Sequence, residues 1–158
     1  MPLEDTIIRD LVNKFPYLGD RIKTERQRRI SLFVDMGRFP EVFEFAVKGM
    51  DFCMLCTITG LDEGRRIGLV YHMAREGGIM LNIKTDIPKD NPALNTVTRI
   101  FPGAEIYERE IADLLGVKVE GLLEGNRYPL SDDWPKDQYP LRKDWKAGSA
   151  RGKEKSDA

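Results

Sequence analysis

The chain has 158 residues, of which 41% are hydrophobic and 32% are charged, and this composition predicts a globular domain with a charged surface. The 25 Lys and Arg residues nearly balance the 26 Asp and Glu residues, giving a formal net charge of -1. This balance argues against a general attraction for nucleic acid or anionic lipid. No apolar run in the sequence approaches the length of a membrane span, and the first residues do not predict a secretory leader. We therefore expect a cytoplasmic protein with reduced thiols.

The first half of the chain predicts alternating helical and extended segments. Apolar spacing predicts a helix over 3–15. Strict alternation over 21–35 predicts one strand with a single covered face. Helical spacing returns over 39–47, and an apolar run at 52–58 predicts a buried strand.

A three-stranded antiparallel meander is the clearest secondary-structure signal. It consists of the apolar run at 52–58 and of two alternating segments, 67–73 and 79–83. The segment Gly60–Gly64 predicts the first turn, and Glu76–Gly78 predicts a hairpin turn before the last strand.

Two helices are predicted to follow the meander. Asp90 and Pro92 suggest the start of a helix that runs to about residue 101. A second helix is predicted over 104–115, with Gly116 as its C-terminal cap. Together these elements predict an α+β core over residues 1–116, with a mostly antiparallel sheet backed by helices.

Beyond Gly116 the periodicity ends. Residues 117–145, here called the strap, combine prolines, aromatics and charges without a repeat, which predicts an extended segment that binds a partner. The polar segment 146–158 predicts a disordered tail.

Three candidate chemistries have a simpler structural explanation. Cys53 and Cys56 form a CxxC pair inside an apolar, strand-like run, so we interpret them as buried structural thiols rather than as a redox or metal pair. His72 is the only histidine that could act as a general base, and we interpret it as a residue on a sheet face rather than as a catalytic one. The basic run Lys23–Arg29 suits a solvated strand edge, with nucleic-acid or acidic-protein binding as alternatives.

The predicted helix at 104–115 is the densest cluster of charge. Glu105, Arg109 and Asp113 follow at four-residue spacing, which predicts ion pairs of alternating sign along one helical face. Ion pairs of this kind are common on exposed helices and do not indicate function by themselves. Their combination with the strap predicts an interaction protein.

At this point the residues resemble a known family. The segment Tyr107–Val117, followed by Glu120 and Gly121, resembles the signature of the C subunit (30 kDa subunit) of NADH:quinone oxidoreductase, the respiratory complex I family. Pro140–Asp144 matches that family's closing motif, and Asp132–Trp134 stands where the family has two acids and a tryptophan. The resemblance covers roughly residues 28–145 and includes Tyr71 and His72.

The resemblance implies a subunit without a catalytic centre or bound cofactor, on the cytoplasmic side of a membrane complex. It implies three partners: a large, D-like catalytic subunit, a small, B-like iron–sulfur subunit and a ferredoxin-like, I-like subunit. These partners would carry iron–sulfur clusters and, in hydrogenases, a nickel–iron centre. Contact with the membrane would run only through the complex, and nucleic acid would not be a ligand.

The chain departs from the family pattern at Leu122 and Leu123, where His and Pro are usual, and at Arg127, which replaces an Arg pair. These departures, with the short N-terminus and the polar tail, favour the corresponding subunit of an archaeal-type membrane-bound hydrogenase or sulfur reductase. The C subunit of an NADH- or ferredoxin-linked quinone oxidoreductase is the alternative, and a free-standing nucleic-acid-binding domain is the alternative from another class. The predicted docking residues are Tyr107, Glu108, Arg109, Glu110, Asp113, Trp134, Pro140, Leu141, Arg142, Lys143 and Asp144.

Overall fold

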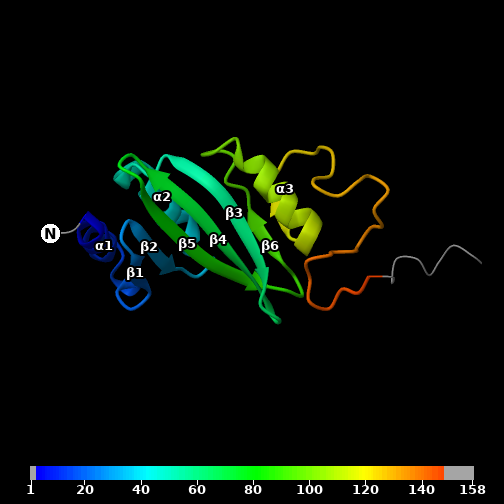
Figure 1. Ribbon diagram of the computed structural model, residues 1–158, viewed down its shortest axis with the longest axis horizontal. Helices are drawn as coiled ribbons and strands as arrows, with labels where there is room; N and C mark the ends of the chain where they lie inside the picture. Colours follow the sequence, from blue (N-terminus) through cyan, green and yellow to red (C-terminus); the bar gives the residue numbers. More distant parts are fainter. Residues whose placement is uncertain (1–2, 148–158) are drawn as a thin grey trace, which may run out of the picture. The chain divides into compact units, whose positions relative to one another are not determined.

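The computed structural model describes residues 3–147, which form two compact units. The first unit holds the residues up to Thr59 together with Gly68–Asp86, and the second holds Gly60–Ile67 and the residues from Ile87 on. The elements are shown in Figure 1 and are, in chain order, α1 (Leu3–Lys14), the short 3-10 helix η1 (Pro16–Leu18), β1 (Ile22–Arg26), β2 (Arg29–Phe33), α2 (Phe39–Met50), β3 (Met54–Asp62), β4 (Arg66–Arg75), β5 (Ile79–Pro88), β6 (Ala93–Asn95), α3 (Ala104–Leu115) and β7 (Lys118–Glu120).

A five-stranded sheet with the order β1-β2-β5-β4-β3 confirms the predicted α+β class. β3, β4 and β5 form the predicted meander, because turns of three residues can join only antiparallel neighbours. β1 and β2 are also antiparallel, whereas β2 pairs in parallel with β5, so the sheet is mixed. The parallel pair sets Ser31 directly opposite Asn82.

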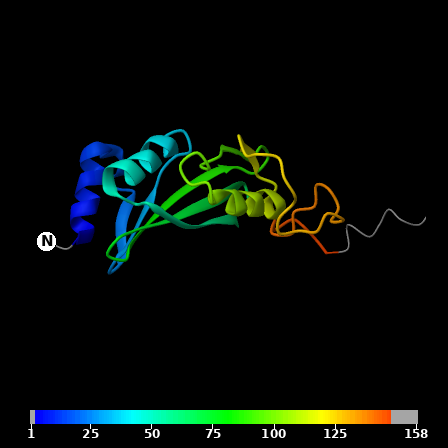
Figure 2. The same cartoon turned by 90° about the horizontal axis from the view of Figure 1, so that it is seen from above.

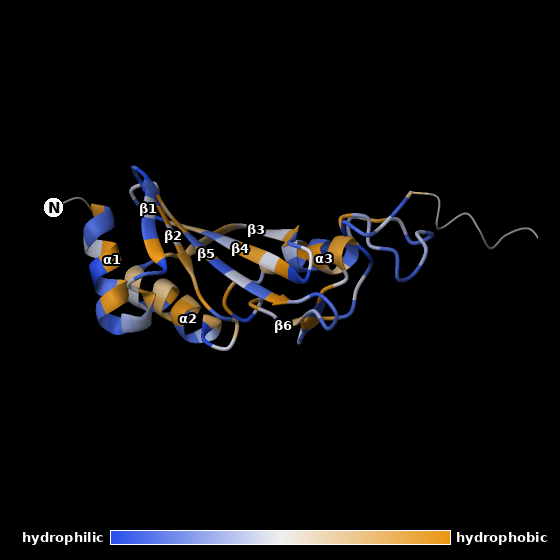
Figure 3. Cartoon of the chain, turned by 90° about the horizontal axis from the view of Figure 1, so that it is seen from below, coloured by the Kyte–Doolittle hydropathy of each residue, from blue (hydrophilic) through white to orange (hydrophobic). Residues whose placement is uncertain are grey.

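Amphipathic helices cover one side of the sheet in the first unit. Figures 2 and 3 show α1 and α2 on the same side of the strands, and Figure 3 shows apolar and polar residues on both helices. The aromatic rings of Phe39 and Phe43 on α2 pack against the buried Tyr71 of β4, at centroid distances of 4.5 and 5.6 Å. The helices predicted over 3–15, 39–47 and 104–115 are thereby confirmed as α1, α2 and α3.

One polar side chain from each of four strands joins a hydrogen-bonded ladder across the sheet. Thr59 Oγ1 lies 3.0 Å from His72 Nε2, and His72 Nδ1 lies 2.9 Å from Asn82 Oδ1. Asn82 Nδ2 donates to Ser31 Oγ over 3.4 Å. The ladder follows the spatial strand order β3-β4-β5-β2, and it gives His72 the sheet-face position predicted from the sequence.

Two secondary-structure predictions were wrong. The single strand predicted over 21–35 is a hairpin of β1 and β2, since Arg28 adopts a positive φ of 60° and reverses the chain. The helix predicted from Asp90 to about residue 101 is instead β6 followed by a turn, in which Phe101 N donates to Val97 O. The segment contains β-branched residues that disfavour helix, and β6 gains a parallel partner in β7.

The interpretation of the cysteines as buried was also wrong. Cys53 and Cys56 are both exposed free thiols. Cys56 lies in β3, which is the last strand of the sheet, and Met54 beside it is 50% exposed. The apolar run therefore reflects an uncovered sheet edge rather than a strand buried on both faces.

No helix among residues 3–147 is long and apolar enough to span a membrane. Most of the tail predicted to be disordered, residues 148–158, lies outside the described residues.

Candidate functional site

The second unit is organised around α3, whose C-terminal end receives the strap. Gly116 ends the helix in the left-handed conformation, at φ 71° and ψ 32°, as its predicted role as a cap requires. A Cβ atom at this position would lie 2.6 Å from the ring of Tyr139, so the close approach of the strap also requires glycine. The helix end and the strap therefore fit each other only with this residue between them.

The strap binds two of the carbonyl groups that the end of a helix leaves without partners. Leu141 N donates to Leu114 O over 3.1 Å, and Arg142 Nε donates to Leu115 O over 2.7 Å. The Arg142 guanidinium also lies 4.7 Å from the Tyr139 ring centroid. A cation at this position suits the negative end of the helix dipole.

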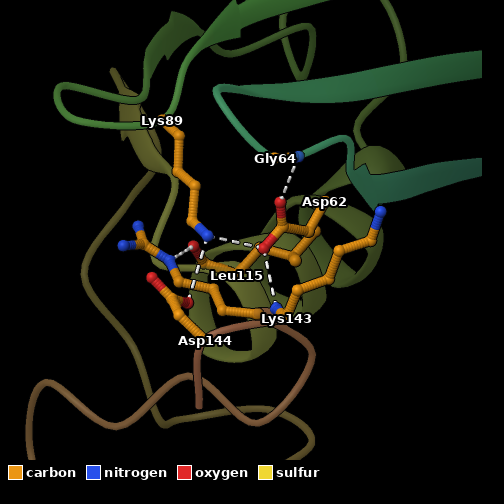
Figure 4. A network of polar contacts seen from close by, with 7 residues as sticks. Asp62, Gly64, Lys89, Leu115, Lys143 and Asp144 are labelled. Atoms are coloured by element: carbon orange, nitrogen blue, oxygen red, sulfur yellow. Dashed lines mark hydrogen bonds and ion pairs between the residues drawn. The ribbon is translucent and has the colours of Figure 1, made fainter.

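A buried carboxylate holds the next part of the strap. Figure 4 shows Asp62 at the centre of this network: Lys89 Nζ lies 2.7 Å from Asp62 Oδ2, and the backbone N–H groups of Gly64 and Lys143 each donate to the carboxylate over 2.8 Å. Lys89 also pairs with Asp144 at 3.1 Å. We call Asp62, Lys89, Lys143 and Asp144 the Asp62 cluster.

The Asp62 cluster has a strong effect on its central acid, whose side chain is only 1% exposed. Burial by itself raises the pKa of Asp62, but Lys89 and the two backbone N–H groups outweigh burial and lower the pKa to about 2. The pKa of Lys89 is raised, chiefly by its bond to Asp62. Asp62 and Lys89 are therefore ionised at neutral pH, and the cluster fixes residues 143 and 144 to the turn between β3 and β4.

A second set of polar contacts joins Asp113, in the last turn of α3, to the strap. Asp113 accepts from Arg127 Nε over 2.9 Å and from Leu130 N over 3.1 Å. Arg127 Nη1 then donates to Trp134 O over 2.8 Å. The rings of Trp134 and Trp145 lie 6.0 Å apart. Both tryptophans of the protein belong to the strap, so tryptophan fluorescence follows the state of this segment.

The predicted ion-pair ladder on α3 is only half present. Arg109 bonds Glu105 with two nitrogens, at 3.0 and 2.8 Å, as the four-residue spacing predicts. Asp113 pairs with Arg127 instead of Arg109, because the strap brings that guanidinium close. Arg109 also donates to Leu123 O over 2.7 Å.

Glu108 lies on the buried side of α3, with an exposed fraction of 0%. Its carboxylate accepts from Thr96 Oγ1 over 2.6 Å and from Val97 N over 2.7 Å. Burial raises the pKa of Glu108, while these two hydrogen bonds oppose the rise. Within this chain Glu108 fixes the turn that follows β6.

The structure brings the predicted docking residues together from both motifs, with different exposures. Leu141, Lys143 and Asp144 are exposed, whereas Glu108 is buried. The remaining members are partly exposed, namely Tyr107, Arg109, Glu110, Asp113, Trp134, Pro140 and Arg142. Their role in docking stays a prediction.

Several residues that build this site were missed by sequence reasoning. Asp62 and Lys89 hold the strap, yet Asp62 precedes its partner Lys143 by 81 positions. A carboxylate next to the glycine of a turn is too common to suggest such a partner. Tyr139 was part of the predicted strap, but its contact with Gly116 depends on the fold.

The basic run predicted as a strand edge lies on β1, in the turn that follows it and at the first residue of β2, Arg29. Lys23 and Lys84 both pair with Glu25, at 3.2 and 3.6 Å. This carboxylate interrupts the positive charge that a phosphate backbone would follow.

Comparison with known proteins finds a family match that spans both motifs. Residues 32–151 match the family described as the 30 kDa subunit of respiratory-chain NADH dehydrogenase. The C subunit of the F(420)H(2) dehydrogenase of Methanosarcina mazei is 34% identical over 143 residues, covering 89% of this chain and 90% of that protein. The beta subunit of the membrane-bound hydrogenase of Pyrococcus furiosus is 29% identical over 154 residues, covering 92% and 88%. A chain in the structure of the membrane-bound sulfane sulfur reductase, an archaeal respiratory membrane complex, has a TM-score of 0.80 and 32% identity, covering 90% of this chain and 85% of that chain.

Proposed function

Because the chain belongs to the family of the 30 kDa subunit of respiratory-chain NADH dehydrogenase, we propose that it is a non-catalytic structural subunit of a complex I-like, ion-translocating membrane oxidoreductase. The match confirms the resemblance predicted from the two motifs. The relatives named above are subunits of a dehydrogenase, a hydrogenase and a sulfur reductase complex, which supports membership of an oxidoreductase complex.

The joining of the two motif segments carries the docking part of this proposal. The bonds from Leu141 and Arg142 to the end of α3 place Pro140–Asp144 beside the signature helix. These bonds use backbone and guanidinium groups, so the side chains of Leu141, 55% exposed, and of Lys143 remain available to a partner. An apolar side chain next to a cation, both on a backbone segment held by hydrogen bonds, is typical of a protein–protein interface.

In this proposal the surface docks the large, D-like catalytic subunit. The small, B-like iron–sulfur subunit and the I-like, ferredoxin-like subunit are its neighbours in the peripheral arm. The redox centres, iron–sulfur clusters and a possible nickel–iron site belong to those partners, and this chain holds the catalytic subunit in place. The arm lies on the cytoplasmic side, and contact with the membrane runs through the complex.

A paired substitution tests docking without breaking the strap. Leu141→Asp with Lys143→Glu changes two exposed side chains and leaves their backbone N–H bonds in place. We expect the variant to lose co-purification with the large subunit when all the subunits of the complex are expressed together. The control is Lys48→Glu on α2, where the side chain is 68% exposed. Normal recovery of the large subunit with the paired variant would refute the docking surface.

The type of complex is a separate part of the proposal. The likeness to the sulfane sulfur reductase chain and to the hydrogenase subunit supports an archaeal-type hydrogenase or sulfur reductase. The 34% identity to a subunit of an F(420)H(2) dehydrogenase favours a dehydrogenase-type complex as the second candidate. Assays of the purified complex for hydrogen evolution, for polysulfide reduction and for oxidation of a reduced cofactor distinguish these candidates.

A further inference from the structure

A groove of about 550 Å³ lies between the beginning of α3 and strap residues 125–128. Its walls include Ile106 and Arg109 from the helix and Arg127 and Tyr128 from the strap. Apart from Arg109, these residues are outside the docking set predicted from the sequence. The groove is therefore a separate feature of the second unit.

Exposed apolar side chains border this groove. Ile106 is 45% exposed and Tyr128 is 43% exposed, and both line the groove. Single exposed apolar residues are ordinary, but two that line one groove indicate a surface that another molecule covers.

Two arginines give the groove a fixed polar side. Arg109 uses Nε and Nη2 for Glu105 and Leu123 O, and Arg127 uses Nε and Nη1 for Asp113 and Trp134 O. Among the described residues, Nη1 of Arg109 and Nη2 of Arg127 have no hydrogen-bond partner. Because both guanidinium groups are already held by carboxylates, the free N–H groups keep a defined position.

Gly125 allows the strap to form this groove. A Cβ atom at Gly125 would lie 2.5 Å from Arg109 Nη2 and would push the guanidinium away. The groove thus depends on close packing between the strap and Arg109.

We propose that this groove binds an extended segment of a partner subunit that combines an apolar side chain with a neighbouring carboxylate. The apolar side chain fits against Ile106 and Tyr128, and the carboxylate accepts from the free guanidinium nitrogens. The open donors select this partner: Arg109 and Arg127 are each paired with a carboxylate of this chain, and their remaining N–H groups can bind only an acceptor, which a carboxylate supplies with both of its oxygens. The inference rests on the proposed function, to which it adds the chemistry of one contact.

Photo-crosslinking in the assembled complex tests the groove. A benzophenone amino acid replaces Ile106, the complex is purified and irradiated, and mass spectrometry identifies the joined peptide. We expect a peptide of one partner subunit with an apolar residue within a few positions of Asp or Glu. Attachment to a second copy of this chain, to a peptide without a carboxylate, or to nothing at all would overturn the inference while the assembled complex still supports the proposed function.

A matched pair of substitutions provides the second measurement. Ile106→Asp places a carboxylate in the first turn of α3, where the helix dipole favours it, so the fold is retained. We expect roughly tenfold weaker assembly of the complex, the typical effect of losing one apolar anchor. Leu3→Asp, at a side chain that is 46% exposed, is the control and should leave assembly unchanged. Equal assembly of both variants would exclude the groove as a binding site.

Discussion

Replacing Asp62 by Asn removes the charge at the centre of the Asp62 cluster and preserves the shape of the side chain. The amide oxygen of the variant still accepts one backbone N–H group, from Gly64 or Lys143. The ion pair with Lys89 is lost, and Lys89 keeps only the exposed Asp144, whose side chain is 68% exposed. The substitution therefore tests how much an ionised Asp62 stabilises the attachment of the strap.

The pKa gives the size of the effect. A carboxyl whose pKa falls from 3.8 to about 2 on folding gains roughly 2 kcal/mol, at about 1.36 kcal/mol per unit. The Asp62 side chain is nearly inaccessible, so solvent screening does little to reduce this figure. We expect Asp62→Asn to lower the free energy of unfolding by roughly 2 kcal/mol at pH 7.

The effect has a defined pH dependence. The pKa of Asp62 is lower in the folded than in the unfolded chain, so its stabilisation is complete above the unfolded value of 3.8. This contribution disappears as the pH falls from about 4 toward about 2. The difference between the two proteins should therefore shrink over this acidic range.

Urea unfolding followed by tryptophan fluorescence measures the loss, because Trp134 and Trp145 are both in the strap. The control is Asp10→Asn, at an exposed ion pair with Arg9, which should change stability by less than about 0.5 kcal/mol. Equal midpoints for Asp62→Asn and the unsubstituted protein at pH 7 would refute the reasoning. A difference that persists unchanged below pH 3 would show that its origin is not the charge of Asp62.

Two further predictions follow from other buried and exposed groups. The pKa of Glu108 is raised on folding, so the stability of the unsubstituted protein falls as the pH rises from 4.5 toward the pKa in the folded state. In urea titrations, Glu108→Gln should therefore become more stable relative to the unsubstituted protein as the pH rises. A difference in stability that stays constant with pH would contradict this. Because Cys53 and Cys56 are exposed, both thiols should react with Ellman's reagent in the native protein nearly as fast as in the denatured chain, and slow reaction before unfolding would contradict their exposure.

Local patterns predicted most of the first unit and α3. Alternation and turn glycines identified the meander, and Gly116 marked the end of α3 correctly. These signals are reliable because each depends only on residues that are close together in the sequence. The helix-start signals at Asp90 and Pro92 were misleading, since long-range pairing with β7 determines that segment.

The candidate site was predicted in its parts but not in its internal contacts. The motifs linked α3 with Pro140–Asp144, and hydrogen bonds at the end of α3 join the two segments. The resemblance to the family was correct. The burial of Glu108 was not foreseen, because a charged side chain suggests exposure even where its spacing places it on the helical stripe of Ile111 and Leu115. The exposure of Cys53 was missed because sequence alone does not show which strand ends a sheet.

The polar ladder from Thr59 to Ser31 makes the alignment of four strands unique. A slip of one residue in β4 would turn His72 to the opposite face and leave Asn82 and Thr59 without their partner. An entirely apolar sheet face tolerates such a slip more easily, because one aliphatic contact replaces another. The hydrogen bonds thus select one strand alignment among several that hydrophobic burial alone would permit.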